Sequence, residues 1–283
     1  MSLIERFDVV VRGEEVGETA DGVVIHRTTL IRYAKEPTDN YHVFVRLDHL
    51  LRVDETGEGN EKEIMFANLH DEDGMVLRME DGRVVNLGTL PEQQIHAIGR
   101  LPRWEFVGPV NFPPVGLAPG KGKLHLQGVL AAAADQDVTK MPDNRYRCTK
   151  AADRVGGDRT YVKIFDPSLG VNVNYRTYDA ETKQLLRNTR YSFERQNGVV
   201  VPVSVFHSDE EMVSIDLSPK PGSSRTQWQL RWLQVGDPLD HKPCSREDIG
   251  NSELLRELCD FEGSDDDRRG VKRGLPLERT RDF

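Results

Sequence analysis

Polar and apolar residues alternate along much of the chain, a pattern typical of strands whose successive side chains point to opposite faces of a sheet. The clearest run extends from Tyr41 to Val53. One of its two faces carries Tyr41, Val43, Val45, Leu47, His49, Leu51 and Val53. The other face is mostly polar, with Phe44 and Leu50 as exceptions. Strands average about five or six residues, so a run this long predicts a large, bent sheet.

Shorter runs of the same kind predict the remaining strands. Their ranges are Phe7–Arg12, Gly22–Ala34, Ile64–Leu69, Met75–Met79, Arg83–Leu87, Leu124–Leu130, Tyr161–Phe165, Val171–Tyr178, Leu185–Arg195, Val199–Val205, Met212–Leu217 and Thr226–Val235. The dipeptides Asp73-Gly74, Asp81-Gly82 and Asn197-Gly198 separate neighbouring runs and favour tight hairpins. Pro202 cannot donate a ladder hydrogen bond, so we expect it at a bulge or with its nitrogen facing away from a neighbour. The predicted fold class is mainly β, a large curved antiparallel sheet (an open half-barrel) with a few short covering helices.

Helical signals are few. Pro91–Arg100 could form one short helix. Near the C-terminus, Ser245 and Asp248 resemble a capping box, and a helix beginning there would end before Gly263. Its apolar face would consist of Leu254, Leu255, Leu258 and Phe261.

These elements predict three regions. Residues 1–240 form the curved antiparallel half-barrel domain, 241–262 a C-terminal helical extension, and 263–283 a flexible charged tail. The segment Gly88–Gly122 differs from its surroundings because it contains six prolines among several aromatic residues. We expect this segment to pack against another part of the protein because of its aromatic residues.

Charge excludes some partners. The net charge of -9 and the pI near 5.5 argue against nucleic acid, whose phosphates require a basic surface. The sequence contains no run of about eighteen apolar residues, so no membrane span is predicted. Neither the charge nor the pattern of the chain indicates an oligomeric state.

The three cysteines, Cys148, Cys244 and Cys259, cannot all pair with one another, and none forms a CxxC motif. A disulfide between Cys244 and Cys259 is an open alternative to three free thiols. The start Met1-Ser2-Leu3 contains no secretory leader, and a leader removed before it would leave the compartment open.

Catalytic motifs are missing from the sequence. Gly120-Lys121-Gly122-Lys123 lacks the spacing and hydroxyl residue of a phosphate-binding loop. The run from His70 to Asp73 is a hairpin turn in preference to a metal site, because neighbouring strand residues point to opposite faces. No nucleophile motif occurs, and a carboxylate pair in a groove is the only hydrolytic arrangement left open. We therefore predict no catalytic residue, no metal and no cofactor.

Aromatic residues are the remaining candidates for a site. Five fall on apolar faces of late strands and three lie in the proline-rich segment; they are Tyr175, Tyr191, Phe193, Trp228, Trp232, Trp104, Phe106 and Phe112. Together they could line an apolar hollow that accepts an acyl chain. The alternative is that they simply form the core.

One region resembles a known superfamily. A strand ending in Phe165-Asp166-Pro167-Ser168-Leu169-Gly170, a long hairpin through Tyr178-Asp179-Ala180-Glu181, and Asn197-Gly198-Val199-Val200-Val201-Pro202 follow in that order. This region, Tyr161–Pro202, resembles the outer-membrane lipoprotein-sorting (LolA-like) superfamily, especially its divergent planctomycete-type members. The resemblance implies an open half-barrel whose concave face binds a lipid or an acylated polypeptide.

Three functions remain open. The first is a non-enzymatic binding protein of the cell envelope or periplasm, which would hold a lipid, an acyl chain or a lipidated protein. The second is a structural or interaction protein with a filled core and no ligand. The third is a carboxylate-dependent polymer hydrolase. A cytoplasmic location is the alternative to the envelope.

Overall fold

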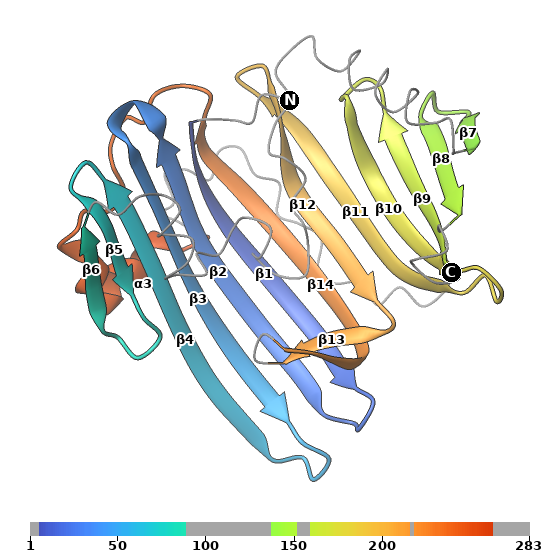
Figure 1. Ribbon diagram of the computed structural model, residues 1–283, viewed down its shortest axis with the longest axis horizontal. Coiled ribbons are helices and arrows are strands. Elements are labelled where there is room, and N and C mark those ends of the chain that lie inside the picture. The colour runs from blue at the N-terminus through green and yellow to red at the C-terminus, as the bar shows by residue number, and fades with distance from the viewer. Residues whose placement is uncertain (1–5, 89–136, 152–158, 216–217, 263–283) are drawn as a thin grey trace.

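The computed structural model describes residues 6–88, 137–151, 159–215 and 218–262. The strands form one antiparallel sheet that is not closed into a barrel (Figure 1), which confirms the predicted fold class. The strand order across the sheet is β6-β5-β4-β3-β2-β1-β14-β12-β11-β10-β9-β8-β7, with β13 paired to β14. The bounds are β1 (Phe7–Thr19), β2 (Val24–Glu36), β3 (Tyr41–Val53), β4 (Gly59–Asp71), β5 (Gly74–Arg78), β6 (Val84–Gly88), β7 (Asp137–Lys140), β8 (Tyr146–Ala151), β9 (Arg159–Asp166), β10 (Val171–Asp179), β11 (Leu185–Gln196), β12 (Val199–Asp209), β13 (Met212–Ile215) and β14 (Ser218–Val235).

Strands β1–β6 form a first antiparallel meander at one end of the sheet, and β7–β12 form a second meander at the other end. The first long strand, β1, and the last, β14, pair with each other between the two meanders. β1 pairs with β14 over its whole length, from Phe7 opposite Val235 to Thr19 opposite Gly222. β14 also pairs with β12. Strand β14, which comes after both meanders in the sequence, therefore joins the first meander to the second.

The predicted turns adopt the expected geometry. Asn197 and Gly198 have positive φ angles of 48° and 76°, which is the requirement of the tightest right-twisted hairpins. Pro202 lies beside a bulge between β11 and β12, as predicted. Its carbonyl accepts a hydrogen bond of 2.6 Å from Nε1 of Trp232.

Some strand boundaries differ from the predictions. β3 matches its predicted range, whereas β4 begins at Gly59 and β14 at Ser218, several residues before the apolar alternation. β7 and β8 were not predicted, because their sequences are short and mostly polar. The predicted strand Leu124–Leu130 and helix Pro91–Arg100 lie outside the described residues.

Each face of the sheet carries its own apolar cluster. The first, here named the tryptophan face, carries Trp228, Trp232 and the residues in register with them on neighbouring strands. The opposite face, here named the helix face, carries Tyr41, Val43, Val45 and Leu47. Phe44 and Leu50, the exceptions in the β3 pattern, are buried on the tryptophan face. The sheet therefore buries apolar side chains on both sides.

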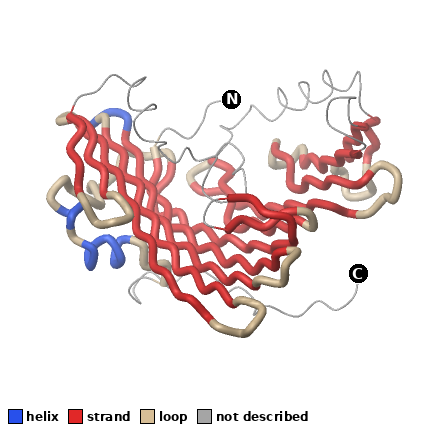
Figure 2. Tube along the Cα trace, turned by 60° about the horizontal axis from the view of Figure 1, so that its bottom comes forward, coloured by secondary structure: helices blue, strands red, loops and turns tan. Residues whose placement is uncertain are grey.

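The C-terminal extension covers the helix face of the first meander. Its elements are the 3-10 helix η4 (Asp248–Gly250) and the α-helix α3 (Ser252–Leu258), and Figure 2 shows both on the outer side of the bent sheet. Ile249, Leu255 and Cys259 are fully buried against β3, β4 and β5. The hydroxyl of Tyr41 donates a hydrogen bond of 2.9 Å to the carbonyl of Cys244 and accepts one of 3.2 Å from its amide.

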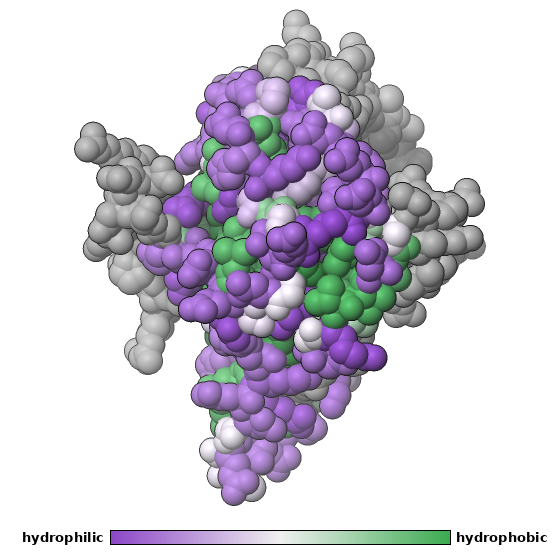
Figure 3. Space-filling view, turned by 90° about the vertical axis from the view of Figure 1, so that its left-hand side faces the viewer, coloured by the Kyte–Doolittle hydropathy of each residue, from purple (hydrophilic) through white to green (hydrophobic). Residues whose placement is uncertain are grey.

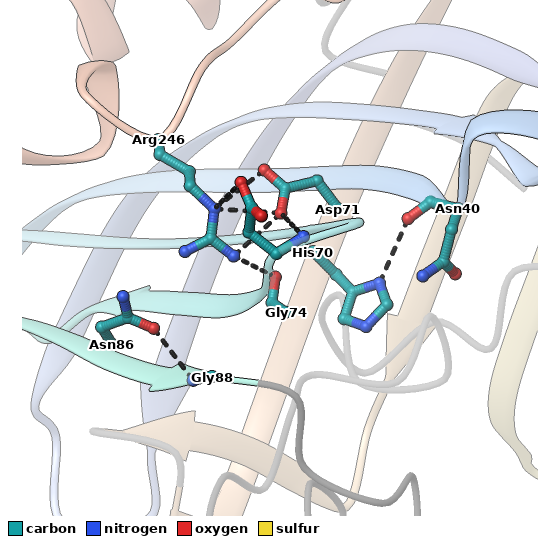
Figure 4. A network of polar contacts seen from close by, with 8 residues as sticks. Asn40, His70, Asp71, Gly74, Asn86, Gly88 and Arg246 are labelled. Carbon is teal, nitrogen blue, oxygen red and sulfur yellow. Dashed lines mark hydrogen bonds and ion pairs between the residues drawn. The ribbon is translucent and has the colours of Figure 1, made fainter.

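An arginine fastens this extension to the β4–β5 hairpin (Figure 4). Nε of Arg246 lies 2.9 Å and 3.0 Å from the carboxylate oxygens of Asp71, and Nη2 donates to the carbonyl of Gly74 at 2.6 Å. Both side chains are largely shielded from solvent. A planar guanidinium fits a carboxylate through parallel hydrogen bonds, so the contact fixes orientation as well as position.

One detail of the extension corrects a prediction, and another decides an alternative that the sequence left open. Ser245 and Asp248 form a hydrogen-bonded turn before η4, whereas α3 begins later and is capped by the Asn251 side chain, which accepts from the amides of Glu253 and Leu254. All three cysteines are free and buried, so no disulfide joins Cys244 and Cys259. Within the described residues, no helix is long and apolar enough to cross a membrane.

Within the described residues, no strand pairs with the outer edge of β6. Val84 and Val85 are among the large apolar side chains that stay exposed, and apolar surface is visible among polar surface on that side of the molecule (Figure 3). β6 is only five residues long, which limits how much unpaired backbone this edge presents.

A glycine makes room for a tryptophan at the centre of the sheet. Gly13 of β1 lies opposite Trp228 of β14, and the indole ring covers the glycine so closely that a Cβ atom there would lie 2.2 Å from Cζ3. A large aromatic ring over a strand glycine compensates for the missing side chain. Gly13 is therefore required for the packing of Trp228.

We predict that Gly13→Ala destabilises the protein by about 1–3 kcal/mol, because the added methyl group must displace the ring. Gly59→Ala on β4 is the matched control, since its nearest neighbour is the flexible end of Leu51 at 3.3 Å. Urea unfolding of both variants measures the difference. Equal destabilisation of the two would contradict the proposed packing.

A second prediction concerns the thiols under the extension. Burial raises the pKa values of Cys244 and Cys259 to about 12, so both remain neutral thiols that react slowly with a disulfide reagent. In a Cys148→Ala background, Arg246→Ala should accelerate their labelling about tenfold, because it loosens the extension.

The control for this experiment is Arg256→Ala in the same extension. Arg256 forms an exposed ion pair with Glu63, and such pairs contribute little to stability. Its replacement should leave the labelling rate nearly unchanged. Acceleration by Arg256→Ala alone would contradict the role assigned to Arg246.

Candidate functional site

An unbroken row of aromatic rings crosses five neighbouring strands on the tryptophan face. Ring centroids lie 6.0 Å apart for Trp232 and Phe7, 4.8 Å for Phe7 and Tyr33, and 5.9 Å for Tyr33 and Phe44, all edge to face. Phe66 continues the row at 6.4 Å from Phe44. Contacts of this geometry stabilise a fold by about 0.5–1.5 kcal/mol each beyond the area that they bury. Most of these rings are deeply buried, and Phe66 and Tyr33 partly so.

A second aromatic group lies on the same face of the second meander. The ring of Tyr191 is 5.9 Å from Tyr175 and 6.0 Å from Phe193. We name these three residues the tyrosine group. Each is half-buried, in contrast to Trp228 and Trp232, which are 2% and 7% exposed. Burial nevertheless raises the pKa of Tyr175 and that of Tyr191, so both hydroxyls stay protonated.

The structure brings together five of the eight predicted site residues. Register places Tyr191 opposite Val205, and Val205 opposite Trp228, so the tyrosine group and both tryptophans share one face. The other three, Trp104, Phe106 and Phe112, lie outside the described residues. The described part of the predicted set therefore consists of a covered pair of tryptophans and an accessible tyrosine group.

A polar band lies beside the aromatic row on the same face. Glu15 and Arg27 form an ion pair of 3.0 Å and are 5% and 8% exposed. Asp48 accepts hydrogen bonds from Arg46 at 2.7 Å and Thr29 at 2.5 Å. Burial raises the pKa of Glu15 despite the neighbouring arginine.

These carboxylates do not form the pair that glycoside hydrolysis requires. A hydrolase needs one carboxyl group that holds a proton and a second one beside it, both open to substrate. Glu15 and Asp48 are each held by an arginine, and the sheet places them on β1 and β3 with β2 between. Each arginine neutralises the buried carboxylate beside it, and buried charges in proteins are usually paired in this way.

Two histidines stack on the same face near the start of β3. The rings of His42 and His70 lie 5.5 Å apart and nearly parallel, and Nδ1 of His70 lies 3.2 Å from the carbonyl oxygen of Asn40. Figure 4 shows His70 turned toward Asn40 and away from Arg246. Within the described ranges, no three histidine, cysteine or acidic side chains lie close enough to hold a metal ion. Asp71, in the run considered for metal binding, is engaged by Arg246.

Sequence patterns missed part of this face. Phe7, Tyr33, Phe44 and Phe66 complete the aromatic row, yet they were not among the predicted site residues. Each is one aromatic residue in a strand with few others. Their alignment depends on the register of five strands, which no single strand encodes.

Comparisons with known proteins give no family assignment. No protein-family model matches the chain, and no curated protein matches it. Among solved structures, the chain is similar to a DUF1329 family protein from Desulfovibrio piger at 10% identity, covering 88% of this chain and 92% of that one, with a TM-score of 0.35. It is also similar to a porin-like protein from Bacteroides uniformis at 7% identity, covering 81% and 99%, with a TM-score of 0.21. At these scores neither likeness assigns a function, and the resemblance to the LolA-like superfamily is not confirmed.

The buried histidine gives this face a pH dependence. Burial, together with the smaller effects of His70 and Lys35, lowers the pKa of His42 to about 4. In the unfolded chain its pKa is near 6.5. As the pH falls from 6.5 to 4, the unfolded chain binds a proton that the folded protein does not, so stability decreases.

We therefore predict that the unfolding free energy of the native sequence falls by about 1 kcal/mol more between pH 7 and pH 5 than that of His42→Gln. Chemical denaturation at the two pH values measures this difference. An NMR titration should place the His42 ring well below the usual range. The same loss in both proteins would contradict a buried, neutral His42.

Proposed function

We propose that this protein is a non-enzymatic binding protein of the cell envelope that holds a lipid, an acyl chain or a lipidated polypeptide against the tryptophan face. The observation that carries the proposal is the tyrosine group. Tyr175, Tyr191 and Phe193 stay half-buried on an apolar face whose tryptophan rings are only 2% and 7% exposed. The envelope location is supported by the LolA-like resemblance of Tyr161–Pro202.

The chemistry of the tyrosine group suits an alkyl chain. Burying a methylene group contributes about 0.8 kcal/mol, so a few methylene groups laid across three rings give useful binding without any charged contact. The rings are flat and have few rotatable bonds, so they lose little conformational freedom when they hold a ligand. Lys163 lies on the same face, with Nζ 5.8 Å from the Tyr175 ring, and could attract an acidic headgroup at the edge.

A second candidate is a structural or interaction protein with a filled core and no ligand. The burial of the central row favours it, because the protein's own residues leave Phe7, Val9 and Val11 at most 2% exposed. The two candidates differ in one respect. The binding protein uses the tyrosine group as a contact surface, whereas the structural protein uses it only as the margin of its core.

The test uses the full chain and a fluorescent palmitate analogue. We predict saturable binding, weakened about tenfold by Phe193→Ser, which corresponds to about 1.4 kcal/mol. Phe206→Ser is the matched control. Phe206 is also half-buried, but it lies on the opposite face of the adjacent strand and packs under Arg190.

Native mass spectrometry and solvent extraction of the purified protein complete the experiment. Co-purified lipid together with the Phe193→Ser defect would support the binding function. If the native sequence binds no probe, or if Phe193→Ser and Phe206→Ser weaken binding equally, the structural alternative is correct.

A further inference from the structure

A cavity lies on the helix face of the second meander, at the opposite end of the sheet from α3. It encloses about 500 Å³ and is bounded by β8, β9, β10 and β11. Its apolar floor is formed by Val162 and Ile164 of β9, both buried. The volume falls within the range of small-molecule sites, about 300–1,000 Å³. We name it the arginine cavity for the side chains at its rim.

Among the described residues, four arginines and no carboxylate line the arginine cavity; they are Arg145, Arg147, Arg176 and Arg190. Arg145 is paired with Asp143, whose Oδ2 lies 2.7 Å from its Nε. Arg190 lies over the ring of Phe206, 4.8 Å from its centroid. Arg147 and Arg176 have no acidic partner within the described residues. This concentration of positive charge is unusual in a chain with a net charge of -9.

Strand register explains why these side chains surround one space. Arg190 lies opposite Asn174, Asn174 opposite Ile164, and Ile164 opposite Arg147, so one row across four strands has an arginine at each end. Arg176 lies opposite Val162 in the next row of the same face. Neighbouring strands are about 4.8 Å apart, so long arginine side chains from both ends can reach a ligand above Ile164.

The floor also contains a buried oxygen atom that accepts no hydrogen bond from any described residue. Asn174 is 5% exposed, and its amide nitrogen donates to Asn188 at 3.1 Å. Its Oδ1 atom is buried and accepts no hydrogen bond within the described part of the chain. Buried acceptors are usually satisfied by protein or by a bound molecule. A ligand hydroxyl or water on this floor would supply the missing donor.

We propose that the arginine cavity binds an organic phosphate, a small molecule whose dianionic phosphate group contacts Arg147 and Arg176 and whose apolar part lies on Val162 and Ile164. Guanidinium groups bind phosphate oxygens through paired hydrogen bonds. More than one uncompensated arginine favours a doubly charged group over a single carboxylate. The four arginines lie on the other face of the sheet from the proposed lipid site, although Tyr191 of β11 borders both.

The experiment titrates the full chain with hexyl phosphate, inorganic phosphate and hexanol by calorimetry. Hexyl phosphate should bind most tightly, and inorganic phosphate and hexanol should each bind at least tenfold more weakly. Affinity should fall with added salt, since the contacts are electrostatic. Binding of hexanol as tight as that of hexyl phosphate would overturn the proposal.

Charge reversal identifies the site. Arg147→Glu and the milder Arg176→Gln should each lower the affinity for hexyl phosphate at least tenfold, with thermal unfolding checking that the variants fold. Arg52→Glu is the control, since Arg52 is likewise exposed on a strand but lies on β3 in the first meander. An equal loss in Arg52→Glu would show a mere effect of net charge and overturn the site.

Two further arms distinguish the source of the phosphate and the two proposed sites. Sedimentation with phosphatidic acid vesicles, lost in Arg147→Glu, would support the site and identify a membrane lipid headgroup as its ligand. Binding of hexyl phosphate without vesicle sedimentation would support it and identify a soluble phosphate ester. Phe193→Ser should leave hexyl phosphate binding unchanged, so failure of the proposed lipid site would not remove the arginine cavity.

Discussion

The constraint on which this structure depends is that one sheet must bury apolar side chains on both of its faces. A two-sheet sandwich covers one face of each sheet with the other sheet, but the described strands here form a single layer. The helix face of the first meander is covered by the C-terminal extension, through Ile249, Leu255 and the Arg246–Asp71 contact. The tryptophan face instead joins aromatic rings from strand to strand, so that Trp232, Phe7, Tyr33 and Phe44 bury one another in part. The two faces therefore differ in composition, because one is covered by the C-terminal extension and the other by its own aromatic rings.

The pairing of β1 with β14 makes the two meanders into one sheet. Each meander consists of local hairpins, whereas Phe7 and Val235 are separated by nearly the whole chain. Such a pairing requires a large loss of chain entropy before its contacts form. The Gly13–Trp228 contact lies at this central pairing, and the hydrogen bond from Trp232 to Pro202 lies beside it, between β14 and β12. Trp228 and Trp232, the tryptophans of the described residues, therefore lie where the chain most needs contacts that specify register.

The sequence predicted the parts of the fold that are encoded locally. Alternation located β3, and Asn197-Gly198 located a hairpin, because period-two burial and positive φ angles depend on neighbouring residues alone. The burial of Phe44 was not predicted, because the alternation pattern assumes that one face of a strand is exposed to solvent. Both faces of β3 are in fact buried. The start of α3 was misplaced because Ser245 and Asp248 form a cap-like turn that is not continued by a helix.

For the candidate site, apolar faces identified Trp228, Trp232 and the tyrosine group. The arginine cavity could not be foreseen, since Arg147, Arg176 and Arg190 come from three strands whose register no motif records.

The opposed faces of the second meander bear on how the protein could handle an amphiphilic partner. On β11, Tyr191 and Phe193 face one side while Arg190 faces the other, so one strand contributes to both the tyrosine group and the arginine cavity. A single small ligand cannot occupy both, because the sheet backbone separates them. A change in the twist of β10 and β11 would, however, alter both surfaces at once, since the same backbone positions every one of these side chains. Coupling between two ligands would then require only that each prefers a different twist, which is the thermodynamic condition for linkage between sites.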